Sequence, residues 1–152
     1  MASDWGHNLR IEASRHTGRS VRTRTFSRKL IAACYFFQFA ATVAWWVWMF
    51  NVPEHRALFF APSTDEIILG KFSYPDLIVF GGCSLLTCFL AAFHRRSAPV
   101  LAWVTFGAAL YACVGAFAVN WPLLQVPLAD AMMVLTVVAS LVFAVALGRC
   151  YE

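Results

Sequence analysis

Four ionisable side chains in this sequence have types and positions that could bind a cation or transfer a proton. Glu54 and His55 follow a first long apolar stretch, Asp76 opens a second and Asp130 opens a fourth. If these ends meet on one face of a membrane, Glu54 and His55 are candidate metal ligands, and Asp76 and Asp130 are candidate catalytic carboxylates. The alternative is that both aspartates begin helices, where the helix dipole favours a negative charge. We favour the second interpretation.

Three further polar side chains stand within the apolar stretches. Gln38, with Thr42 one helical turn later, is the strongly polar group of the first stretch, and Tyr111 lies in the third. Each could line a path for a ligand. Each could equally hydrogen bond to a neighbouring helix, which is the commoner use of such residues in membranes.

The sequence has no signature of a familiar cofactor. All four histidines lie outside the apolar stretches, so no pair is placed to ligate a haem within a bilayer. Those stretches also contain no lysine for a retinal Schiff base. The five cysteines form no Cys-x-x-Cys pair of the kind found in zinc sites. The cofactor, if there is one, stays unassigned.

The apolar stretches themselves predict the fold class. Hydrophobic residues make up 61% of the 152 residues and charged residues only 13%, against about 25% charged in soluble domains. Stretches of about 20 apolar residues can cross the hydrocarbon core as helices. We therefore predict an all-α integral membrane four-helix bundle over residues 30–148, with spans at 30–50, 77–93, 99–119 and 129–148 and a cytoplasmic tail at 149–152.

Capping patterns predict where two helices begin. Ser63 followed by Glu66, with a stop at Gly70, indicates a short interfacial helix in the first outer loop. Ser73 followed by Pro75 and Asp76 indicates the start of the second span.

Residues 1–29 form a basic arm. They carry seven Lys or Arg residues against Asp4 and Glu12, a net charge of +5. We expect the arm to be disordered in solution, with residues 10–29 attracted to anionic lipid headgroups. Nucleic acid is not the expected partner, because the arm has few aromatic side chains to stack on bases.

The positive charges also predict an orientation. With the N-terminus inside, the inner segments carry ten Lys or Arg residues and the outer loops carry two, Arg56 and Lys71. This asymmetry predicts that both termini are cytoplasmic, in what we expect to be a bacterial cytoplasmic membrane.

Small residues at helical spacing predict how the second and third spans pack. In an antiparallel hairpin the two sets fall at similar depths, and small side chains let helix backbones approach closely. Ser84 is expected to contact Ala112. The predicted interface comprises Gly81, Ser84 and Cys88 on the second span and Ala108, Ala112 and Gly115 on the third.

One short motif resembles a known family. Trp121-Pro122 followed by Ala129-Asp130 is similar to the closing motif of lipoprotein signal peptidases, which are four-span proteins with an outward aspartate dyad. Gln125 stands where that family has Asn, and the third span lacks the family's Gly-Asn…Asp-Arg motif. We therefore do not transfer the activity to this chain.

The sequence as a whole predicts a small polytopic membrane protein. Its expected role is that of an accessory subunit, or a hydrophobic-ligand-binding component, of a membrane complex. Its expected partners are membrane lipids and either other membrane subunits or a second copy of the chain. The alternative is a membrane enzyme or transporter that uses the acidic outer-face site of Glu54, His55, Asp76 and Asp130.

Overall fold

The computed structural model describes residues 4–60, 66–119 and 127–152, and these ranges are helical, without strands. Four helical segments are long and apolar enough to cross a membrane, which confirms the predicted all-α four-helix bundle. They are Ser27–Asn51, Leu69–Ala92, Ala98–Ala118 and Pro127–Arg149. The elements in order are α1 (Asp4–Asn51), η1 (Pro53–Leu58), α2 (Glu66–Pro75), η2 (Asp76–Gly81), α3 (Gly82–Ala92), α4 (Ala98–Val119) and α5 (Pro127–Arg149). Ser63 and the Trp121-Pro122 motif lie outside the described residues.

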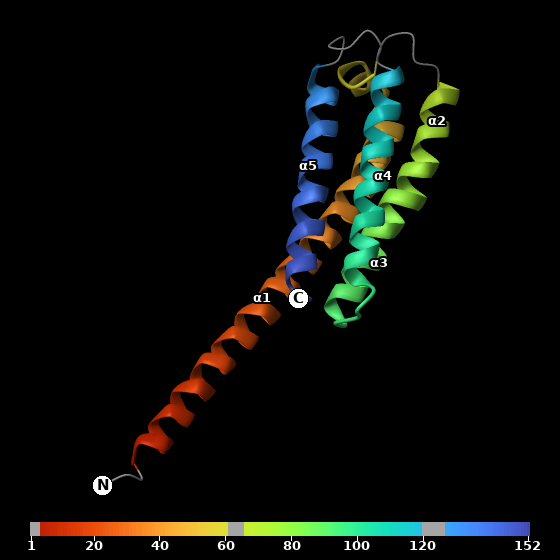
Figure 1. Cartoon of the computed structure of the whole chain (residues 1–152). Coiled ribbons are helices and arrows are strands. Elements are labelled where there is room, and N and C mark those ends of the chain that lie inside the picture. The colour runs from red at the N-terminus through yellow and green to blue at the C-terminus, as the bar shows by residue number, and fades with distance from the viewer. Residues whose placement is uncertain (1–3, 61–65, 120–126) are drawn as a thin grey trace.

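The helix α1 includes the basic arm. Residues 4–29 were expected to be disordered, but in the structure they continue the first span without a break. The spanning segment already supplies a helical nucleus, so adding residues avoids the cost of nucleation, and Arg is a good helix former. Figure 1 shows this part of α1 projecting beyond the other helices.

The second span begins earlier than the sequence pattern indicated. The helix is formed from Glu66 and continues through Gly70 and Ser73, so the predicted stop and the predicted cap are both wrong. The Ser73 hydroxyl donates to the Gly70 carbonyl oxygen at 3.0 Å and therefore caps no helix N-terminus. The expected interfacial helix is the first part of this span, and the preceding loop instead contains the short 3₁₀ helix η1.

A π-helical turn follows Pro75 within the second span. Proline has no N–H to donate and its ring clashes with the preceding turn, so the regular hydrogen-bond ladder is interrupted there. The turn η2 widens the helix, and the Gly82 N–H donates to the carbonyl oxygen of Leu77, five residues back. Asp76 is thus inside a continuous span, and its predicted role as a helix-starting residue is wrong.

The helices pack in the order α1, α3, α4, α5. We call the end of the bundle with η1 the η1 end, and the end with Arg28 and Cys150 the arm end (Figure 1). At the arm end α1 and α5 are held together. The Arg28 guanidinium donates to the Cys150 carbonyl oxygen at 2.6 Å and lies 4.7 Å from the centre of the Tyr151 ring. Tyr35 and Phe143 form an edge-to-face pair with ring centres 5.9 Å apart.

At the η1 end the chain folds back over the end of α1. Arg56 donates to the Met49 carbonyl oxygen at 2.8 Å, which satisfies one of the free carbonyls of the last helical turn. Phe59 packs edge-to-face on Trp45 with ring centres 4.5 Å apart, and it also contacts Trp48. Phe59 is therefore buried under α1 rather than extended into solvent.

Two glycines of the predicted packing interface lie close to residues outside it. A Cβ added at Gly81 would approach Phe39 and Thr42 of α1. A Cβ at Gly115 would lie 2.8 Å from the ring of Phe72 on α2. The direct polar contact between α3 and α4 joins the hydroxyls of Thr87 and Thr105 at 3.2 Å.

Three further members of the predicted interface are at least partly buried. Ser84 is fully buried, and its hydroxyl donates to the Phe80 carbonyl oxygen on its own helix. Cys88 packs against the core cluster at the arm end, and Ala108 is half-buried.

Candidate functional site

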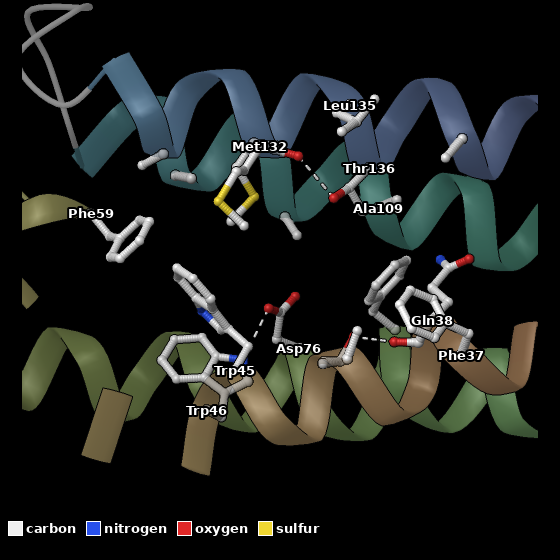
Figure 2. A pocket seen from close by; sticks show the side chains of 18 of the residues that line it. Phe37, Gln38, Trp45, Trp46, Phe59, Asp76, Ala109, Met132, Leu135 and Thr136 are labelled. Carbon is white, nitrogen blue, oxygen red and sulfur yellow. Dashed lines mark hydrogen bonds between the residues drawn. The ribbon is translucent and has the colours of Figure 1, made fainter. Parts of the chain in front are cut away.

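A cavity of about 580 Å³ lies within the bundle, between α1 and η2 on one side and α4 and α5 on the other. Figure 2 shows Trp45, Trp46 and Asp76 facing Met132 and Thr136 across this space. Its other lining side chains are almost all apolar or aromatic, and Phe59 and Phe60 lie at its η1 end. They include Phe37, Gln38, Thr42, Phe72, Phe80, Ala109, Ala112, Met133, Leu135 and Phe143.

The cavity exists because short side chains line it. Four helices cross here, but at several lining positions they place a methyl group where a larger side chain would fill the space. Protein interiors normally pack without voids of this size. The cavity therefore results from the small side chains that the sequence places at these positions. Alanines contribute to the wall from three helices: Ala33 and Ala41 from α1, Ala109, Ala112 and Ala116 from α4, and Ala129 and Ala139 from α5.

The cavity opens sideways, between α1 and α5. Five of its lining residues are exposed, and all five belong to these two helices: Ala33, Phe37, Ala41, Met132 and Leu135. Phe37 is 73% exposed and Leu135 68% exposed. The α4 residue Ala109, in contrast, is only 3% exposed and belongs to the closed back wall. In a membrane this opening faces lipid.

One carboxylate faces the cavity. The Asp76 side chain projects into it from η2, and its Oδ2 accepts a hydrogen bond from Trp46 Nε1 at 3.1 Å (Figure 2). Trp46 is 4% exposed, so its indole is fixed by packing as well as by this bond. Asp76 is the only Asp, Glu, Lys, Arg or His among the lining residues.

The other polar side chains of the cavity are bonded mainly to the helices themselves. Gln38 Nε2 donates to Ser140 Oγ at 3.0 Å, so Gln38 both links α1 to α5 and lines the cavity. Its Oε1 is buried and has no partner among the described residues. The Thr42 hydroxyl donates to the Gln38 carbonyl oxygen, and the Thr136 hydroxyl donates to the Met132 carbonyl oxygen, each at 2.9 Å.

The predicted acidic outer site is not assembled in the described part of the chain. Glu54 and His55 are exposed on η1, where the His55 ring packs against Trp48. Asp130 is in the first turn of α5, as expected, and borders a separate groove beside Phe117. No three His, Cys, Asp or Glu side chains among the described residues come together as metal ligands would.

Tyr111 lies away from the cavity. Its side chain is 75% exposed on the outer surface of α4, so the structure places it in neither the ligand path nor the interhelical hydrogen bond considered for it.

The sequence carries a signal for the cavity that lies outside its recognisable motifs. Ala33, Phe37, Ala41 and Trp45 follow one another at intervals of four, which places them along one face of α1. Ala109, Ala112 and Ala116, at intervals of three and four, likewise share one face of α4. Such stripes look like ordinary packing faces, and only the separation of the helices shows that they border an open space.

The fold and this site define a class: an all-α protein with four helices suited to cross a membrane and a cavity that opens between two of them. Comparison of the chain with protein-family models, with curated proteins and with solved structures found no match.

Proposed function

We propose that this protein binds a hydrophobic small molecule within the membrane, as an accessory component of a membrane complex. The observation that carries the proposal is the cavity, whose volume of about 580 Å³ is within the range of about 300–1,000 Å³ typical of ligand sites. Its opening between α1 and α5 supports entry from the lipid phase.

The remaining surface supports the accessory role. Large apolar side chains are more than half exposed on two helices, Val100 and Val114 on α4 and Val142 on α5. They suit lipid and partner helices alike, so the partners we propose are lipids and other membrane subunits or a second copy. The basic arm would lie on the cytoplasmic face, against anionic headgroups.

An enzyme or transporter acting through an acidic outer face has less support. Glu54 and His55 are exposed on η1, Asp130 borders a groove outside the cavity, and Asp76 faces the cavity. The four side chains therefore lie in three different surroundings rather than in one site.

The test is to extract the full-length protein in a mild detergent and examine it by native mass spectrometry. We expect a small hydrophobic adduct on the native chain. Ala112→Phe would fill the cavity, because Ala112 lines it, and should remove the adduct. The matched control is Val114→Phe, two residues along the same helix, where the side chain is 60% exposed and outside the cavity.

Retention of the adduct in a folded Ala112→Phe variant would contradict the proposal. So would the absence of any adduct on the native chain, if added hydrophobic molecules also failed to bind it.

A further inference from the structure

We infer that the ligand of this cavity is a lipophilic organic cation, with an ammonium group beside Asp76 and an apolar body between α1 and α5. The inference rests on the proposed function and specifies the chemistry of that same site. Among the described lining residues, Asp76 is the only acidic or basic side chain, so the charge that the cavity would select for is positive.

The carboxylate has no cationic partner in the wall. A carboxylate in apolar surroundings costs free energy unless hydrogen bonds or an opposite charge compensate it. Trp46 Nε1 supplies one hydrogen bond, to Oδ2, and no Lys, Arg or His is among the described residues that line the cavity. A cationic ligand would supply the missing charge.

Aromatic rings surround the same end of the cavity. Trp45, Trp46 and Phe59 lie on the same side of Asp76 in Figure 2, and Phe60 packs on Trp46 with ring centres 6.5 Å apart. Aromatic faces attract ammonium groups through their quadrupoles, and indole rings do so most strongly. The carboxylate and the rings therefore favour the same kind of head group.

The hydroxyl groups of the cavity also favour a ligand that donates hydrogen bonds or carries positive charge. Thr42 and Thr136 both use their protons on carbonyl oxygens of their own helices, which leaves only their oxygen lone pairs for a ligand. Among the described lining residues, the donors that remain are the Trp45 indole N–H, the second amide proton of Gln38 and the weakly donating Cys34 thiol. Acceptors thus predominate.

The shape of the cavity fits a head group with a chain. Lining residues of α1 run from Trp46 to Ala33, which is roughly 20 Å along a helix. The charged and aromatic groups are at the Trp46 end, and the other end is bordered by Phe37 and Phe143. Asp76 is seven residues inside the span that starts at Leu69, or about 10 Å, a depth that an amphiphile's head group can reach.

The test compares two probes with the same chain and different charge. The cationic probe is a nitroxide with a dodecyldimethylammonium substituent, and the neutral probe is the same nitroxide with a dodecanoylamide substituent. A nitroxide bound beside Asp76 quenches the fluorescence of Trp45 and Trp46, so saturable quenching of the full chain in nanodiscs reports binding. Dodecyltrimethylammonium, which has no nitroxide, should reverse the quenching.

We expect the cationic probe to bind the native chain about 10- to 100-fold more tightly than the neutral one, because its ammonium charge pairs with the carboxylate and makes cation–π contacts with the indole rings. Asp76→Asn should abolish most of that preference. Glu54→Gln, which removes an exposed carboxylate outside the cavity, should preserve it.

The outcomes distinguish failure of this inference from failure of the proposed function. Equal binding of both probes overturns the inference and leaves the proposed function standing. A preference that survives in folded Asp76→Asn also overturns it. Absence of saturable quenching by either probe overturns both. If Asp76→Asn does not fold, the ratio of the affinities of the cationic and the neutral probe for the native chain decides whether the inference holds.

A second arm identifies the source of the ammonium group. The cationic probe is titrated in nanodiscs of phosphatidylglycerol alone and in nanodiscs that also contain phosphatidylethanolamine. Competition by phosphatidylethanolamine supports the inference with a lipid head group as the ligand. Unchanged affinity supports it with a free amphiphilic amine.

Discussion

The hydrogen bond between Trp46 and Asp76 can be measured by a double-mutant cycle. Trp46→Phe keeps an aromatic ring but removes the donor, and Asp76→Asn keeps an acceptor but removes the negative charge. A hydrogen bond to a charged group contributes about 1.5–3 kcal/mol and one between neutral groups about 0.5–1.5 kcal/mol. The packing lost with the smaller ring is common to both backgrounds, so it cancels in the cycle. We therefore expect a coupling free energy of about 1–2 kcal/mol.

The assay is reversible unfolding in mixed detergent micelles, followed by far-ultraviolet circular dichroism because tryptophan fluorescence changes with the mutation. Trp48→Phe combined with Asp76→Asn is the control, since Trp48 contacts His55 and Phe59 and is not among the described residues that line the cavity. That pair should be additive within about 0.5 kcal/mol. Additivity of Trp46→Phe and Asp76→Asn would refute the placement of Asp76 in the cavity wall against the indole.

Three other predictions follow from the packing. Ala112→Phe should change the melting temperature in detergent little, because the ring can enter the cavity. A decrease in the free energy of unfolding above the roughly 1–3 kcal/mol typical of overpacking would indicate a tight contact instead. Arg28→Ala should destabilise the protein by about 1–2 kcal/mol through loss of the bonds to the Cys150 carbonyl, with Arg28→Lys intermediate and exposed Lys29→Ala near neutral in the same melt. With cytoplasmic termini, an impermeant thiol reagent outside intact cells should label a cysteine introduced at Glu54 and not one at Ser97; the reverse pattern would invert the orientation.

The boundaries of three of the four spans could be predicted from the local sequence pattern, and the start of the second could not. The first, third and fourth predicted spans end within about three residues of the structure's boundaries, because each is a long apolar run bounded by polar or turn residues. The second span was predicted to begin at residue 77, but the helical segment that is apolar enough to cross a membrane already begins at Leu69. Ser73 and Pro75 have the composition of a helix start, yet the chain accommodates both within a helix by forming the π turn η2.

The candidate site was predictable only in part. Gln38 and Thr42 were recognised as polar groups in an apolar helix, and both line the cavity, with Gln38 also making the interhelical bond considered for it. Asp76 was recognised as a candidate carboxylate but placed at an outer mouth with Glu54 and Asp130. Its actual direction follows from η2, because a wide turn changes which face of the helix each residue occupies.

The sequence by itself determined that this chain is helical, that four of its helices suit a membrane, and that its basic charge is concentrated in the first 29 residues. These properties follow from composition and from periodicity within single segments. The tertiary structure alone decided that alanines of α1, α4 and α5 border a cavity and that Asp76 faces it beside Trp46. The physical reason is that a void and a contact between distant residues depend on the separation and rotation of whole helices, and no single segment encodes either.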